Sequence, residues 1–160
     1  MPLDLCSALA DVHATLVRGA RDLAAAPDPA SARLLTAAIR AHLAAEDDVV
    51  WPVLIERAGA AVELAGLCDD HRALHAVLDR IADESNGPGL GPVAVELRDL
   101  LEEHVAEEEQ VVFAAAVRYL TAADHEYLVD ALLSAAAATT EPGRRRVATG
   151  SDAPDAPAPP

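Results

Sequence analysis

Residues 42–46 read HLAAE and residues 104–108 read HVAEE, so a His-x-x-x-Glu spacing occurs twice in the chain. Side chains four residues apart share one face of an α-helix, because four steps of about 100° exceed one turn by only about 40°. Each pair can therefore present an imidazole and a carboxylate to one point. Apolar residues recur at helical spacing around both pairs, which predicts two helices that carry polar groups on their buried faces.

The composition of the 160-residue chain favours helices throughout. Hydrophobic residues make up 52% of the chain and aromatic residues only 2%, so the apolar content is mainly Ala, Leu and Val. Ala is the strongest helix former, whereas β-sandwiches and barrels need β-branched and aromatic residues, which are scarce here. The sequence therefore predicts an all-α fold.

Charge and targeting signals restrict the partners and the location. The chain has 27 acidic residues against 12 basic ones, and a net charge of −15 repels nucleic-acid phosphates and anionic lipid. We therefore expect neither a nucleic-acid partner nor a membrane partner. Residues 1–13 lack the basic and apolar regions of a signal peptide, and Cys6 and Cys68 are too few for a disulfide framework. We expect a cytoplasmic protein.

Gly and Pro divide the chain into helical segments. The breaks are Pro27-Asp28-Pro29, Gly59 and Asn86-Gly87-Pro88-Gly89, and residues 121–124 have the spacing of a capping box. Pro52 lies inside the second segment and predicts a kink there. The predicted helices span residues 3–25, 29–57, 60–84, 91–119 and 122–138.

Four long helices with short connections favour an up-down-up-down antiparallel four-helix bundle, and residues 122–138 add a short C-terminal fifth helix. We expect this domain to occupy residues 1–139. Residues 140–160 are rich in Pro and Ala and end in SDAPDAPAPP, a composition that predicts a disordered tail.

The histidines and glutamates of these helices fall at one level of the bundle. Residues at equal distances from a turn lie side by side in an antiparallel hairpin. The midpoints of residues 13 and 42, of 46 and 71, and of 71 and 104 are 27.5, 58.5 and 87.5, and each lies in a predicted break. Residues 42 and 75 have the same midpoint as 46 and 71. The residues that this arithmetic gathers are His13, His42, Glu46, His71, His75, His104 and Glu108.

Such a layer fits a metal centre. Unpaired imidazoles and carboxylates in an apolar bundle carry a large desolvation cost, which a metal removes because both groups are metal ligands. Mixed nitrogen and oxygen ligands suit iron, manganese or zinc, and the lack of thiolates excludes a structural zinc site of the cysteine type. Six or seven ligands exceed the number that one zinc ion takes and suit two metals bridged by carboxylates.

Three details of the layer stay open. The layer has six ligands without His75, so His75 can ligate or stay free. A slight rotation of the last helix would replace Glu108 by Glu109, and Glu109 and Asp47 can otherwise support the ligands from outside or be solvated. His125 is predicted to be a surface residue.

These motifs resemble the hemerythrin-like (HHE cation-binding) domain family, over about residues 7–119. The matching segments are His13, HLAAEDDVVWPVL at 42–54, DDHRALHAVL at 69–78 and HVAEEEQVVFA at 104–114. The two halves also repeat each other, because the alignment of His42 with His104 pairs Glu46 with Glu108.

The resemblance implies a four-helix bundle with two non-haem iron ions, bridged by carboxylates and by an oxo or hydroxo group. It implies terminal-ligand roles for His13, His42, His71 and His104. It implies bridging roles for Glu46 and Glu108. If His75 also binds, only one iron keeps an open position for a small ligand; if it does not, both irons have exchangeable positions.

The leading hypothesis is a di-iron protein that binds, senses or reacts with O₂, NO or peroxide, or that handles iron. Binding is favoured over turnover, although a catalase-like or NO-related activity stays open. The alternative is a metal-responsive regulatory or interaction bundle without catalytic turnover. A ferritin-like oxidase fits poorly, because that family uses Glu-x-x-His pairs.

Overall fold

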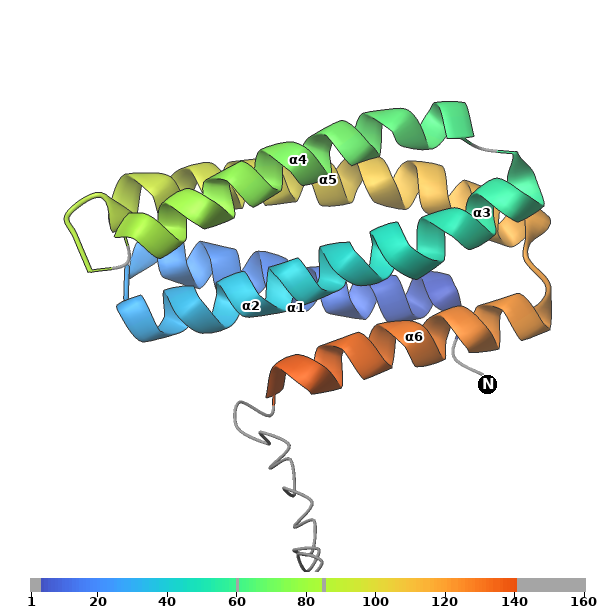
Figure 1. The fold of residues 1–160 in the computed structure, drawn as a ribbon, viewed down its shortest axis with the longest axis horizontal. Helices are drawn as coiled ribbons and strands as arrows, with labels where there is room; N and C mark the ends of the chain where they lie inside the picture. Colours follow the sequence, from blue (N-terminus) through green and yellow to red (C-terminus); the bar gives the residue numbers. More distant parts are fainter. Residues whose placement is uncertain (1–3, 60, 85, 141–160) are drawn as a thin grey trace, which may run out of the picture.

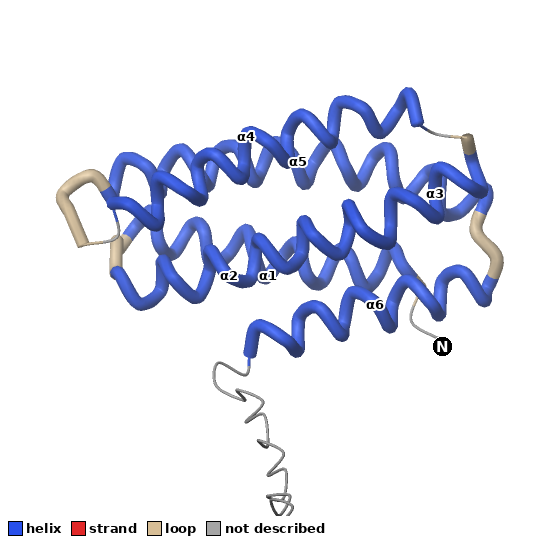
Figure 2. Tube along the Cα trace, in the orientation of Figure 1, coloured by secondary structure: helices blue, strands red, loops and turns tan. Residues whose placement is uncertain are grey.

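The computed structural model describes residues 4–59, 61–84 and 86–140, and every regular element within them is helical (Figure 2). The elements are α1 (Leu5–Ala25), α2 (Pro29–Ala45), the π-helical segment η1 (Glu46–Val50), α3 (Trp51–Ala58), α4 (Ala61–Glu84), α5 (Leu90–Tyr119) and α6 (Ala122–Thr140). The all-α prediction is confirmed, and the predicted boundaries agree within two residues. The tail was predicted from residue 140, which the structure assigns to α6, and the rest of it, from residue 141 onwards, lies outside the described residues.

The long helices form a bundle. Helix α1 packs against α2 and α5, and α4 packs against the same two helices, so α1 and α4 lie on opposite corners. The α1–α2 and α4–α5 connections lie at one end of the molecule, and the α3–α4 and α5–α6 connections lie at the other (Figure 1). No helix in the described ranges is long and apolar enough to cross a membrane.

Local signals fix the start of α2 and the end of α3. The Asp28 carboxylate accepts a hydrogen bond of 2.7 Å from the Ser31 N–H, and Pro29 occupies the first turn, where an N–H is not needed. Gly59 ends α3 with a φ of 63° and donates its N–H to the Ile55 carbonyl. Glycine adopts this left-handed conformation without a steric penalty, which explains why the helix stops there.

The irregularity predicted at Pro52 takes the form of a π-helical turn just before it. In η1 the N–H of Trp51 donates to the carbonyl of Glu46, five residues back instead of four. Pro52 has no N–H and its ring clashes with the carbonyl four residues back in a regular α-helix, so the wider turn is a local way to accommodate it. Glu46 consequently stands at the start of a distorted turn, as functional residues frequently do.

Helix α6 is an integral part of the core. Leu128 and Leu132 are buried in one cluster with Leu5 of α1 and Leu54 of α3. The surface prediction for His125 was wrong. Its ring is half-buried and accepts a hydrogen bond of 3.1 Å from the Leu5 N–H, because the start of α6 lies against the start of α1.

Thr121 and Asp124 form the predicted capping box, in which the backbone N–H of each residue donates to the side chain of the other. The Asp124 carboxylate also accepts from Arg57 of α3 at 3.0 Å. Hydrogen bonds from Thr121, followed by those from Arg57, lower the pKa of Asp124 from 3.8 to about 2. The stabilisation is therefore fully present above pH 3.8 and is lost as the pH falls through about 2.

We expect Asp124→Asn to lower the melting temperature at pH 7 and to lose this effect as the pH falls towards 2. The reason is that the wild-type carboxyl then becomes protonated and no longer accepts its charged hydrogen bonds. Thermal melts between pH 2 and pH 7 measure the difference, with the exposed Asp130→Asn on the same helix as a control. A difference that is the same at every pH would contradict this role.

Candidate metal centre

A polar layer crosses the bundle between two hydrophobic clusters. On α1, α4 and α5, the buried residues of one cluster end and those of the other begin on the two sides of a candidate ligand, and on α2 the change falls between Leu43 and Ala45, next to Glu46. The flanking pairs are Leu9 and Leu16 around His13, Leu43 and Val50 around Glu46, Leu67 and Leu74 around His71, and Leu101 and Val112 around His104 and Glu108. The layer therefore lies in an apolar interior.

Six of the seven predicted ligands meet in this layer, each with an exposed fraction of 6% or less. Their ligand atoms form two sets whose members lie within 4.8 Å of one another. Site A consists of His13, His42, Glu46 and Glu108. Site B consists of Glu46, His71 and His104. Glu46 belongs to both sites, so its carboxylate is the centre of the arrangement.

The two oxygens of Glu46 face different histidines. Oε1 lies 2.9 Å from His42 Nε2 and 3.7 Å from His13 Nε2, which are both in site A. Oε2 lies 3.4 Å from His71 Nε2 in site B. A carboxylate oriented in this way can offer one oxygen to an ion in each site.

Glu108 lies inside the layer and Glu109 lies at its edge. Glu108 Oε2 is 3.3 Å from His13 Nε2 and 3.4 Å from His104 Nε2, and the residue is fully buried. Glu109 is partly exposed and accepts a hydrogen bond of 3.1 Å from the outer nitrogen, Nδ1, of His13. The structure thus places Glu108 among the converging atoms of the layer and Glu109 beside His13 at its edge.

Two more carboxylates lie outside the layer beside its histidines. His71 Nδ1 donates to Asp47 at 2.9 Å. His104 Nδ1 lies 3.6 Å from Asp70, beyond hydrogen-bond distance, and has no hydrogen-bond partner among the described residues. Hydrogen-bonded outer partners fix which ring nitrogen carries the proton and raise the basicity of the other one. The sequence analysis considered Asp47 for this role, and the hydrogen bond to His71 agrees with it.

His75 does not join either site. It is half-buried on α4, one turn beyond His71, and the two sets of converging ligand atoms do not include it. In this arrangement each site has two imidazoles, and Glu46 is the carboxylate that both sites contain.

The geometry fits cations better than hydrogen bonds between the side chains. In the described part of the chain, the buried side-chain atoms without a hydrogen-bond partner are Thr36 Oγ1, Trp51 Nε1 and atoms of the six residues of the layer. Buried polar atoms normally have partners, so these atoms need another one. Two ligand atoms at about 2.1 Å from one ion are about 3.0–3.4 Å apart. Glu108 Oε2 lies 3.3 Å from His13 Nε2 and 3.4 Å from His104 Nε2, which is within this range.

Charge interactions between the histidines and glutamates stabilise the layer in the absence of metal. Burial opposes a charge on His13, but the nearby carboxylates of Glu108 and Glu46 outweigh it and raise the pKa of His13 to about 10. Burial acts against a charged Glu46 too, yet His42, His13 and His71 lower its pKa well below the usual range. A metal ion that binds here displaces protons, because it needs neutral imidazoles.

The match to a family model agrees with this site. The Hemerythrin HHE cation binding domain matches residues 4–116. The chain belongs to the hemerythrin HHE family. This hemerythrin-type domain is a cation-binding domain, its typical metal is iron, and the His and Glu layer is a site that can hold such metal. Comparisons with curated proteins and with solved structures found no match.

Glu109→Gln and Glu108→Gln are expected to differ in their effect on metal binding by this HHE domain. Glu109→Gln replaces the charged acceptor of the His13 Nδ1–H by a neutral amide oxygen and should weaken binding by about tenfold while the number of bound ions stays the same. Loss of the Glu108 charge removes an inner donor and should reduce the number of ions. Metal titration of the two variants tests this, and equal losses would contradict the assignment.

Proposed function

We propose that the layer holds two non-haem iron ions, one in site A and one in site B, and that the domain binds or senses O₂, NO or peroxide. The orientation of Glu46 carries this proposal, since its two oxygens face the histidines of different sites. Glu108 supports it as a second shared carboxylate, placed between His13 and His104. When bound, two irons would supply exchangeable coordination positions and electrons for these small molecules.

The number of protein ligands supports exchangeable positions at both sites. Site A has two imidazoles and two carboxylates, site B has two imidazoles and the Glu46 carboxylate, and His75 belongs to neither. Two histidines and a carboxylate per iron is a ligand set that leaves positions open in non-haem iron proteins. Both sites are therefore open in the proposal.

The surrounding residues would protect and tune the centre. The Trp51 ring packs 5.8 Å from the His71 ring and, with the two hydrophobic clusters, keeps bulk water away from the layer. The carboxylates of Glu109 and Asp47 make the imidazoles that they touch stronger donors, which favours the more oxidised state of a bound metal.

A second candidate is a bundle that responds to metal without turnover. The observation in its favour is that the inner atoms of the layer lack hydrogen-bond partners, so metal loss leaves buried polar groups unsatisfied.

The proposal also includes the up-down-up-down helix order, which the alternating connections in Figure 1 support. It includes a cytoplasmic location, to which the free thiols of Cys6 and Cys68 are suited.

Small-molecule binding is tested on protein loaded with Fe²⁺ without oxygen. Absorption and electron paramagnetic resonance spectra are recorded before and after addition of NO, O₂ or peroxide. We expect a change with at least one of them, and we expect His75→Ala to keep two irons and the same response. An iron-loaded protein whose spectra change with none of the three would contradict the proposed role.

A further inference from the structure

A small pocket between α4 and α5 reaches the polar layer at His104. Its volume is about 50 Å³. The residues that line it are Asp70, Ala73, Leu74, Leu100, Glu103, His104 and Glu107. A space of this size holds one or two water molecules or a partly hydrated ion, and it is far smaller than the sites of about 300–1,000 Å³ that bind organic ligands.

His104 closes the inner end of this pocket. The residue is 2% exposed, its Nε2 lies 3.4 Å from Glu108 in the layer, and its Nδ1 lies 3.6 Å from Asp70 on the pocket wall. The imidazole therefore stands between the pocket and site B. The rings of His13 and His71 are each held by a hydrogen bond to a carboxylate, whereas both nitrogens of His104 lack a hydrogen-bond partner among the described residues. The His104 ring can thus turn without breaking a hydrogen bond.

The outer part of the pocket carries three carboxylates that arginines do not neutralise. Elsewhere on these helices, acidic side chains pair with arginines, as Glu96 of α5 does with Arg80 of α4. Within the described ranges, none of Asp70, Glu103 and Glu107 forms an ion pair with an arginine. A cleft lined by charges of one sign raises the local concentration of ions of the opposite sign. This pocket therefore attracts cations.

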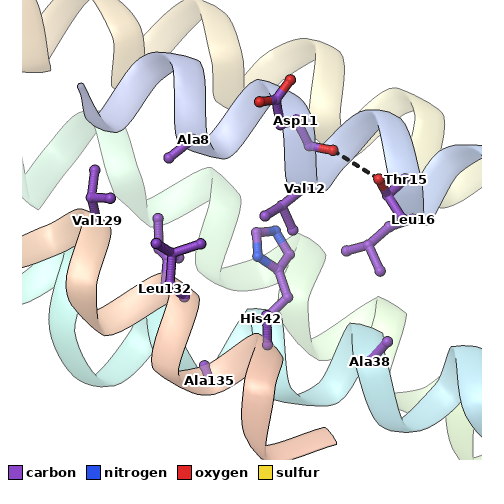
Figure 3. Close-up of a pocket in the computed structure, with 12 residues that line it drawn as sticks. Ala8, Asp11, Val12, Thr15, Leu16, Ala38, His42, Val129, Leu132 and Ala135 are labelled. Carbon is purple, nitrogen blue, oxygen red and sulfur yellow. Dashed lines mark hydrogen bonds between the residues drawn. The ribbon is translucent and has the colours of Figure 1, made fainter. Parts of the chain in front are cut away.

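A larger pocket at site A has a different lining. It has a volume of about 410 Å³, lies between α1, α2 and α6, and reaches His42 (Figure 3). In the close-up, the His42 ring extends from α2 among the side chains of Val12 and Leu16. Apart from His42, Asp11 and Thr15, the lining is apolar. Apolar walls oppose the entry of an ion, because it would lose its hydration without new ligands.

We propose that the small pocket at His104 is an entry port through which divalent cations reach site B. Asp70, Glu103 and Glu107 collect the cation at the surface, and a turn of the His104 ring passes it into the layer. The three carboxylates do not belong to the sets of ligand atoms that converge within 4.8 Å, so they would hold a cation weakly and release it. The inference rests on the proposed metal centre, because site B receives the ion.

The rate of metal uptake tests the entry port. The chain has one tryptophan, Trp51, and its ring lies 5.8 Å from the His71 ring of site B, so a paramagnetic ion that arrives there quenches its fluorescence. Metal-free protein is mixed with Co²⁺ in a stopped-flow instrument at low and at high salt. Co²⁺ is used because air does not oxidise it as it oxidises Fe²⁺.

The double variant Glu103→Gln, Glu107→Gln should be quenched about tenfold more slowly than the wild type at low salt, because the port attracts cations less strongly. Asp70 is left unchanged in this variant, since it lies beside His104. The difference in rate should shrink at high salt, which screens exposed charges. The number of cobalt ions bound at equilibrium should stay the same.

Matched variants separate the port from general effects. Ala73→Leu fills the port and should slow quenching by about tenfold or more at both salt concentrations, since a pocket without free space admits no ion. Ala76→Leu adds the same side chain to an exposed position of α4 and should leave the rate unchanged. Glu84→Gln with Glu126→Gln removes two exposed charges away from the port and should also leave it unchanged. Circular dichroism and metal analysis confirm that each variant keeps its fold and its metal.

Several outcomes would overturn the entry port. These are unchanged uptake rates in both port variants, equal slowing in the control variants, or slowing by Ala38→Phe, which fills the pocket at His42 instead. In each of these cases the protein still binds cobalt at equilibrium, so the metal centre stands and the port alone fails. A wild-type protein that takes up no cobalt at equilibrium would contradict the metal centre itself, and the port would then have no site to supply.

Discussion

Glu46→Ala is expected to reduce the bound metal from two ions per chain to none that survives gel filtration. Glu46 is present in both sets of converging ligand atoms, and its two oxygens face His42 and His71 separately. Removal of one ligand from a site with few protein ligands should weaken the binding of each ion by about a hundredfold or more. This estimate divides a metal-binding free energy of about 10–16 kcal/mol equally among four ligands.

The control for this variant is Asp48→Ala, which removes an exposed carboxylate from the same π-helical turn. It should keep both ions. Metal analysis after gel filtration gives the stoichiometry, and circular dichroism shows whether the helices remain. Two ions retained in a folded Glu46→Ala protein would rule out the shared-carboxylate arrangement.

The second large effect is on stability. Metal loading is expected to raise the melting temperature by about 10–20 °C, because ions at 100 times their dissociation constants add about 2.7 kcal/mol per site and each kcal/mol shifts the melting temperature by about 2–4 °C. The ions also satisfy buried atoms that otherwise lack partners. Thermal melts with and without a chelator measure the shift.

The double variant His42→Ala, His104→Ala removes one imidazole from each site and should abolish this shift. His75→Ala is the matched control, since it removes an imidazole next to the layer that belongs to neither site. A loaded wild-type protein that melts at the same temperature as the chelated one would show that the layer holds no metal tightly.

The sequence predicted most of the layer because two independent patterns agree. Gly and Pro marked the turns, and the midpoints between His13, His42, His71 and His104 fell in these turns. Residues at equal distances from a turn lie at one level of two antiparallel helices. The convergence of these histidines therefore followed from the positions of the turns.

Other features depend on packing that a single sequence does not express. The rotation of α5 decides between Glu108 and Glu109, which are about 100° apart on the helix, and the two hydrophobic clusters fix that rotation. The π-helical turn before Pro52 was expected only as a kink, because the way in which a helix relieves a proline clash depends on its neighbours. Apart from its apolar residues, nothing in the sequence of α6 indicated that this helix would line a pocket of about 410 Å³ together with His42.

Iron stoichiometry, combined with electron paramagnetic resonance, tests the central claim most directly. Metal-free protein is loaded with Fe²⁺ without oxygen, oxidised, freed of excess iron and measured for iron per chain. We predict two irons per chain and no signal from isolated ferric ions, because two ferric ions that share Glu46 and Glu108 couple magnetically. One iron per chain, or two irons with the signal of isolated ferric ions, would contradict the dinuclear centre.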